Sequence, residues 1–177
     1  MHANDIKCET LTILSTNARS VSSKLEELKA TVVDLGPDLI AITKMWTNSS
    51  IQNSQLGIEG YQIVLRRART DTKDGRGGGI LMYAKSSITC HELEVPLDVI
   101  QLAAVQIKLK DSNLKIHTVY RSPNSSVENN INLNEYLRKD VGHQRGWSII
   151  LRANVLSRMS TGDTAHIIIQ GSCLYFA

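Results

Sequence analysis

Polar residues with the potential for chemistry follow four apolar runs of this sequence, where each run ends. They occupy residues 16–20, 43–46, 120–125 and 152–154. In α/β proteins, ligands collect beyond the carboxyl ends of the strands, so these groups together predict one polar site at one sheet edge. The alternative is that they are ordinary turn residues, because chains also turn where strands end.

Several catalytic patterns are absent from the chain. The glycine-rich stretch 75–79 lacks the Lys-Ser/Thr of a phosphate loop and precedes a predicted strand instead of a helix. No G-x-S-x-G nucleophile elbow occurs, and His91-Glu92 has no second histidine at zinc-protease spacing. The five histidines are scattered, so we interpret them as solvated or core residues and predict no metal site built from them.

The elements that must position the strand-end residues begin with a β-α-β unit. Residues 10–16 alternate like a strand, and residues 21–35 carry apolar side chains at helical spacing. Gly36-Pro37 ends that helix, because proline lacks an N–H and restricts the residue before it. The apolar run 38–43 is typical of a strand buried on both faces.

Hairpin-like strands follow this unit. The pattern predicts a helix over 128–139 and strands over 61–67, 80–85, 88–95, 99–109, 114–120 and 148–151. Hairpins after a β-α-β unit indicate an α/β fold in which a mixed sheet sandwich is covered by outer helices.

Length and composition limit the class of protein. A chain of 177 residues suits one domain, and 42% hydrophobic with 21% charged residues excludes wholesale disorder. The longest apolar runs have only four residues, so no membrane span is expected. Three cysteines without paired spacing, and no signal-peptide pattern, favour an intracellular, reducing compartment, nuclear or cytoplasmic. The net charge of +3 is compatible with a polyanionic partner.

Four segments occur in a characteristic order: LTILSTNARSVSSKLEELKATVVDLGPDLIAIT, IEGYQIVLRR, GRGGGILMYAK and VYRSPNSS. Together they resemble the endonuclease/exonuclease/phosphatase superfamily, specifically the endonuclease domain of LINE-type (non-LTR) retrotransposons. The resemblance implies a four-layer α/β/β/α sandwich over residues 10–154, incomplete in its C-terminal part. Residues 1–9 would be an N-terminal tail and residues 155–177 a divergent C-terminal tail.

The family that the chain resembles cleaves phosphodiester bonds of DNA with Mg²⁺. Of its site residues, Asn17 and Tyr120 match the family pattern, and Asn154 corresponds to the asparagine of a G-D-F-N motif. Lys44 stands where the family has a glutamate, and Arg152 where G-D-F-N has its aspartate. A later S-D-H segment of the family is missing here.

These departures change the chemistry that the resemblance implies. Each replacement of a carboxylate by a cation alters the local charge by two units and removes a hard oxygen ligand that Mg²⁺ requires. We therefore expect no cofactor and no metal-dependent cleavage. One alternative is a metal-free phosphate site for DNA or RNA, built by Lys44, Arg152 and Arg121. The others are an active phosphodiesterase and a structural or interaction domain left by decay of a retroelement copy.

The densest basic segment of the chain comprises the end of the predicted strand at 61–67 and the residues after it. It carries Arg66, Arg67, Arg69 and Arg76, with Lys73 between them. Such a segment could follow a DNA backbone through phosphate contacts. The alternative is a solvated hairpin tip.

Overall fold

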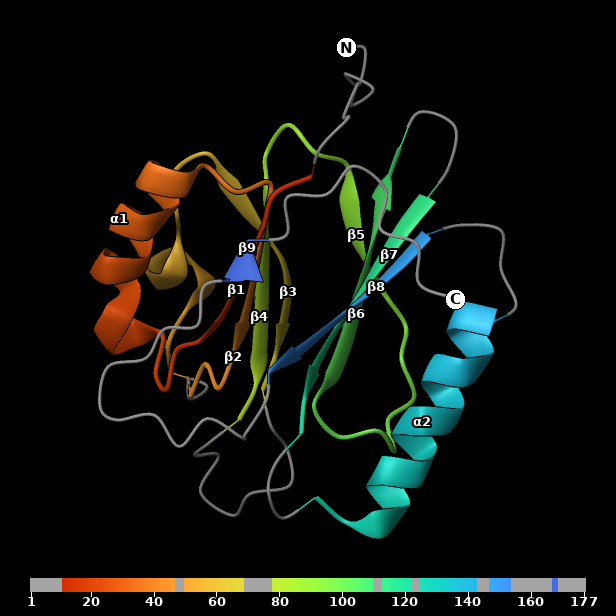
Figure 1. Ribbon diagram of the computed structural model, residues 1–177. Helices are drawn as coiled ribbons and strands as arrows, with labels where there is room; N and C mark the ends of the chain where they lie inside the picture. The colour runs from red at the N-terminus through yellow and green to blue at the C-terminus, as the bar shows by residue number, and fades with distance from the viewer. Residues whose placement is uncertain are drawn as a thin grey trace.

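Two β-sheets packed face to face form the centre of the molecule, and one α-helix covers the outer side of each (Figure 1). This computed structural model describes residues 11–46, 50–68, 78–109, 113–121, 125–142, 147–153 and 167–168. Within them, one sheet has the strand order β3-β4-β2-β1-β9 and the other the order β5-β6-β7-β8. The layered α/β/β/α architecture expected from the sequence is confirmed.

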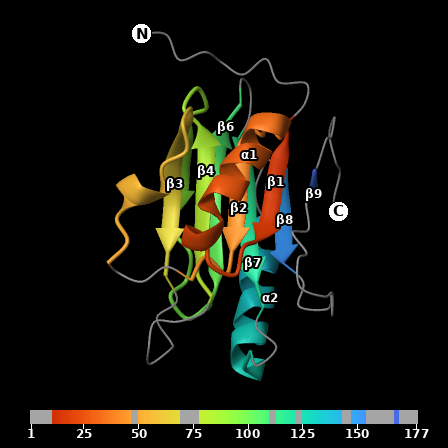
Figure 2. The ribbon, with the colours of Figure 1, turned by 90° about the vertical axis from the view of Figure 1, so that its left-hand side faces the viewer.

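The first sheet contains the predicted β-α-β unit. Strands β1 (Ile13–Asn17) and β2 (Leu39–Thr43) run parallel, and helix α1 (Leu25–Leu35) connects them. Figure 2 shows α1 crossing the outer face of this sheet. Gly36 ends α1 in a left-handed conformation (φ 54°), and its N–H donates to the Val32 carbonyl at 2.8 Å. The remaining elements of this half are η1 (Ser22–Lys24), η2 (Asn53–Leu56), β3 (Tyr61–Arg67), β4 (Ile80–Lys85) and β9 (Ile167–Ile168).

The second sheet also contains one parallel pair of strands, which lies at one edge of that sheet. Strands β7 (Asn113–Tyr120) and β8 (Trp147–Ala153) run parallel and are connected through α2 (Val127–Gly142). Strands β5 (Cys90–Leu93) and β6 (Leu102–Lys108) precede them and pair antiparallel. The carboxyl ends of β1, β2, β7 and β8 all lie at the lower end of the molecule in Figure 1.

Alternation along the strands decides which side chains lie between the sheets. Ile13, at the start of β1, belongs to the core between the sheets, whereas the next residue, Leu14, packs in the cluster under α1. A third cluster, containing Leu133 and Leu137, packs α2 on the second sheet. Burial of each large apolar side chain contributes about 1.5–3 kcal/mol, so these clusters hold the layers together. The same alternation places Asn17 on the face of β1 that lies between the sheets.

Most predicted elements occur where the periodicity indicated. Strands β3 and β4 have the predicted ends, while β1 begins and ends later than expected and β5 is shorter. Residues 22–24 form a 3₁₀ turn ahead of α1, although the pattern predicted a helix from residue 21. Within the segment expected to be a divergent tail, Ile167–Ile168 pair antiparallel with β1. Among the described helices, none is both long and apolar enough to cross a membrane.

Candidate functional site

Asn17 and Thr43 end the two parallel strands of the first sheet and pair with each other in register. The Thr43 side chain is buried and donates to the Thr16 carbonyl at 3.5 Å. The Asn17 Oδ1 atom is also buried and has no hydrogen-bond partner among the described residues. A buried acceptor left without a partner is costly, and such groups are frequent where a ligand binds. Asn17 is therefore the first candidate site residue that the structure supports.

Lys44 follows Thr43 directly and reaches across to the second sheet. Its Nζ lies 5.1 Å from the centre of the Tyr120 ring, which is within cation–π range. Tyr120 ends β7 and is only 5% exposed, and its N–H donates to the Gln101 carbonyl at 3.0 Å. Lys44 as a whole is half-buried, and its ammonium lies over a ring that is itself buried. The carboxyl ends of β2 and β7 thus meet at one point.

Strained backbone surrounds this point. In the described part of the chain, the non-glycine residues with positive φ all lie at or beside these strand ends: Arg19, Ser20, Lys44, Trp46 and Gln101. A left-handed conformation of a non-glycine residue costs about 1–3 kcal/mol and persists only where surrounding contacts impose it. Here the Ser20 N–H donates to the Lys44 carbonyl at 3.1 Å, which ties the ends of β1 and β2 together. Clustering of such strain is typical of functional sites.

Met45 anchors the segment after β2. Its side chain is 1% exposed, and its N–H donates to the Gly79 carbonyl at 3.4 Å. Gly79 has φ 84°, and a Cβ built there would lie 2.9 Å from both Cγ and Cε of Met45. Only glycine therefore leaves room for Met45, and the buried Met45 in turn holds Lys44 and Trp46 at the surface.

Three other candidate residues are Arg121, Arg152 and Asn154. Arg121 follows Tyr120 and is exposed. The backbone of Arg152 pairs with Val119, one position before the pair Tyr120–Ala153. Asn154 lies outside the described residues. The structure thus brings Asn17, Lys44 and Tyr120 to one end of the sandwich and places the Arg152 backbone next to that end.

Two arginines of the basic segment, Arg66 and Arg67, have partners within the molecule. Arg66 donates to the Ile51 carbonyl at 2.7 Å and to Asn53 Oδ1 at 2.9 Å. Arg67 bridges the two sheets by donating to the Leu102 carbonyl and to the Glu92 carboxylate, both at 3.1 Å. Arg69 and Arg76 lie outside the described residues. Contact of these arginines with DNA remains a prediction, and Arg66 and Arg67 have a structural role in addition.

Sequence reasoning did not select Arg19 and Trp46 as site residues, although both belong to the polar groups at 16–20 and 43–46. Arg19 is exposed, and Trp46 is 46% exposed. Both carry the left-handed backbone described above. Their positions two and three residues beyond a strand end were the available signal, but backbone strain is visible only in the folded chain.

Mg²⁺, which the resemblance implies, can be tested against the donor groups present. Asn17 offers one amide oxygen, whereas Lys44 presents an ammonium group at the same strand ends. Within the described ranges, no group of three or more His, Cys, Asp or Glu side chains could hold a metal ion. Mg²⁺ requires hard, anionic oxygen ligands, so the described donors do not fit it.

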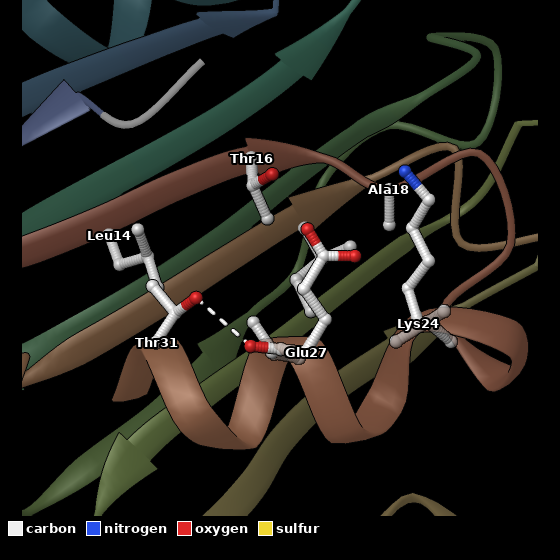
Figure 3. A pocket seen from close by; sticks show the side chains of 9 residues that line it. Leu14, Thr16, Ala18, Lys24, Glu27 and Thr31 are labelled. Atoms are coloured by element: carbon white, nitrogen blue, oxygen red, sulfur yellow. Dashed lines mark hydrogen bonds between the residues drawn. The ribbon is translucent and has the colours of Figure 1, made fainter. Parts of the chain in front are cut away.

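A separate crevice lies on the other face of β1, between α1 and the sheet. Figure 3 shows Lys24 of η1 and Glu27 and Thr31 of α1 beside it, opposite Leu14 and Thr16 of β1. Its volume of about 30 Å³ is room for one or two water molecules, too little for a nucleotide. The strand ends are therefore the better candidate site.

Comparisons with solved structures bear on the fold. The endonuclease domain of TRAS1, a telomere-specific non-LTR retrotransposon, matches 79% of this chain with a TM-score of 0.51 and 12% identity. The human Nocturnin catalytic domain with bound sulfate anion matches 84% (TM-score 0.59, 11% identity), and a 3′-5′ exonuclease from Neisseria meningitidis 80% (0.56, 15%). The chain spans 57%, 65% and 57% of their respective lengths.

Sequence comparison adds nothing to these matches: no protein-family model and no curated protein matched the chain. The structural neighbours include another protein described as an endonuclease/exonuclease/phosphatase family member, from Leptotrichia buccalis, with a TM-score of 0.54 and 12% identity. The two packed sheets and the outer helices agree with these neighbours. This chain has the fold of the endonuclease/exonuclease/phosphatase superfamily.

Proposed function

We propose that this chain is a nuclease-like domain that binds the phosphate backbone of DNA and does not cleave it with Mg²⁺. The observation that carries the proposal is the Lys44 ammonium, held 5.1 Å above the Tyr120 ring at the carboxyl ends of β2 and β7. The ring face, in place of a carboxylate, orients the ammonium. The N–H donors of Lys44 that point away from the ring remain available to a phosphate oxygen.

The surroundings of Lys44 suit an anion better than a metal ion. The half-buried Asn17 can turn its amide N–H groups toward a phosphate, because an asparagine amide carries both donors and an acceptor. Arg19 and Arg121 are exposed cations that follow β1 and β7. One protein of this fold, Nocturnin, has been solved with a bound sulfate anion, which supports the fold's capacity to bind a tetrahedral oxyanion.

The absence of Mg²⁺-dependent cleavage follows, in this proposal, from the charge at the strand ends. A cation at Lys44 repels a divalent metal ion that a carboxylate would attract, and this loss acts together with the arginine at position 152. Without a metal ion, the developing charge on a phosphorane has no Lewis acid to stabilise it. In this proposal the site therefore binds phosphate without cleaving it.

The binding half of the proposal is tested by the salt dependence of affinity for a short DNA duplex, measured by fluorescence anisotropy. Lys44→Ala should lower the affinity and reduce the slope of log K against log salt by about 1, and Lys44→Ala with Arg152→Ala by about 2. Lys108→Ala is the matched control, because Lys108 is exposed and pairs with the first residue of β7. That position lies about 23 Å along the strand from Tyr120. An unchanged slope in the double variant would contradict the proposal.

The cleavage half is tested by incubating supercoiled plasmid with the wild-type chain and Mg²⁺. We expect no nicking above a protein-free control. Nicking that Asn17→Ala abolishes would overturn the statement that the site does not cleave. Absence of both binding and nicking would refute the proposal and favour a structural domain.

A further inference from the structure

Trp46 is a large aromatic side chain that the fold keeps at the surface. It is 46% exposed, although the preceding residue, Met45, is 1% exposed and fully packed. Burial of an indole ring removes a large apolar area from water. An exposed indole beside a buried neighbour therefore calls for an explanation. The chain buries Met45 and leaves Trp46 outside.

The backbone imposes this arrangement at an energetic cost. Trp46 has φ 47° and Lys44 has φ 53°, so two bulky residues flanking Met45 adopt the left-handed conformation. The Trp46 N–H donates to the Gly78 carbonyl at 3.2 Å, and the Val21 N–H donates to the Met45 carbonyl at 2.9 Å. Hydrogen bonds from two directions therefore hold the turn, and the exposure of Trp46 is built into the fold.

We infer that Trp46 is a stacking platform for one unpaired nucleobase of the strand whose phosphate Lys44 binds; the inference rests on the proposed function and deepens it. The Cα atoms of residues two apart in sequence are separated by at most about 7 Å. A single nucleotide spans such a distance between its phosphate and its base. An exposed indole face accepts any base, because every base has a π-face.

This inference defines the class of ligand more narrowly than phosphate binding does. In a duplex, both faces of an internal base are covered by its neighbours, so stacking on Trp46 requires a single strand or a frayed end. The preferred ligand is therefore single-stranded DNA. Sequence preference should be weak, since neither Lys44 nor Trp46 reads the hydrogen-bonding edge of a base.

Two oligonucleotides of equal length separate the base from the phosphate: oligothymidylate, and an abasic analogue with the same phosphates. Wild type should bind oligothymidylate more tightly than the abasic analogue. Trp46→Ala should weaken binding of oligothymidylate about 5- to 150-fold and leave the abasic analogue unchanged. Trp46→Phe should retain most of the affinity, because a smaller ring still stacks.

The matched control is Val33→Ala, which removes an 82%-exposed apolar side chain from α1, far from the strand ends in sequence. It should bind both oligonucleotides as wild type does, and urea denaturation should confirm that every variant is folded. Failure of the wild-type chain to bind either oligonucleotide would refute the proposed function. Binding of both by wild type, with Trp46→Ala retaining full affinity for oligothymidylate, would overturn the stacking inference alone.

Discussion

The Lys44 ammonium lies 5.1 Å from the centre of the Tyr120 ring, and this contact joins the ends of strands that belong to different sheets. Lys44 follows β2 of the five-stranded sheet, and Tyr120 ends β7 of the four-stranded one. A cation placed there replaces the acidic group that the family resemblance implies. The contact shows how the fold accommodates that cation: the electron-rich face of a buried ring stabilises it.

The first prediction concerns the ring. Tyr120→Phe keeps the aromatic face and should bind duplex DNA within about twofold of wild type, whereas Tyr120→Leu should bind about 2- to 5-fold more weakly. The reason is that leucine leaves Lys44 without an orienting surface. Anisotropy titrations at one salt concentration measure both variants. Equal weakening in both variants would assign the effect to the hydroxyl group and contradict the role of the ring.

The second prediction concerns the glycine that admits Met45. Gly79→Ala should lower the free energy of unfolding by more than Gly60→Ala, measured by urea denaturation. Both positions have similar positive φ, 84° and 79°, so alanine is strained at both. Only at Gly79 does the new Cβ also clash with Met45, while at Gly60 it meets nothing within 4 Å.

The displacement of Met45 gives this comparison a second readout. Trp46 adjoins Met45, so Gly79→Ala should also shift the tryptophan fluorescence emission, and Gly60→Ala should leave the emission as it is. Equal destabilisation by the two substitutions would show that Met45 moves without cost and does not anchor the segment.

The third prediction concerns Asp38, which ties three parts of the first sheet together. Its Oδ2 accepts from the Thr12 N–H and its Oδ1 from Lys85 Nζ, both at 2.8 Å. The carboxylate is 20% exposed and Lys85 35%, so solvent screens the pair in part. Asp38→Ala should cost about 1–3 kcal/mol in unfolding free energy, and Asp38→Asn less, because the amide oxygen still accepts one hydrogen bond.

Glu26→Ala provides the matched control for Asp38. Glu26 also pairs with a lysine, Lys29, at 2.9 Å, but its side chain is 85% exposed. Surface pairs of this kind contribute little, so its urea midpoint should stay close to that of wild type. A midpoint shift as large as that of Asp38→Ala would contradict the importance of burial.

The fourth prediction concerns His117, which is fully buried between β7 and α2. Burial lowers its pKa below the usual 6.5, and Lys115 lowers it further, while Asp140 opposes the shift in part. Asp140 Oδ2 lies 3.2 Å from His117 Nε2 without hydrogen-bond alignment, and the other carboxylate oxygen, Oδ1, pairs with Lys115 Nζ at 2.6 Å. The Tyr136 ring packs edge-on against the imidazole at 5.8 Å.

The lowered pKa makes stability depend on pH in a defined direction. Below pH 6.5 the unfolded chain binds a proton at this histidine more readily than the folded one does, so stability should fall as pH falls from 6.5 toward the folded pKa. Above pH 6.5 this histidine does not make stability depend on pH. Urea midpoints between pH 5 and 8 measure the effect. His117→Gln should flatten the profile and His91→Gln, at an exposed histidine, should not; identical profiles in both variants would contradict the assignment.

Much of the secondary structure could be predicted because its signals are local. The alternation in 61–67 and 80–85 and the Gly36-Pro37 stop depend only on neighbouring residues, and β3, β4 and the end of α1 occur accordingly. The start of α1 was predicted too early, because helical spacing does not distinguish a 3₁₀ turn from the first turn of an α-helix. The pairing of Ile167–Ile168 with β1 had no local signal, since a two-residue strand shows no periodicity.

The features of the candidate site also divide into those that the sequence predicts and those that only the folded chain shows. The sequence by itself determined that polar residues end the strands, that Asn17 and Tyr120 follow a known pattern, and that Lys44 replaces an acid. Only the tertiary structure decided that Lys44 rests on Tyr120, that Arg66 and Arg67 are held by internal partners, and that Trp46 stays outside. Each of these depends on contacts between segments distant in sequence, which form when the two sheets pack, and local periodicity carries no record of them.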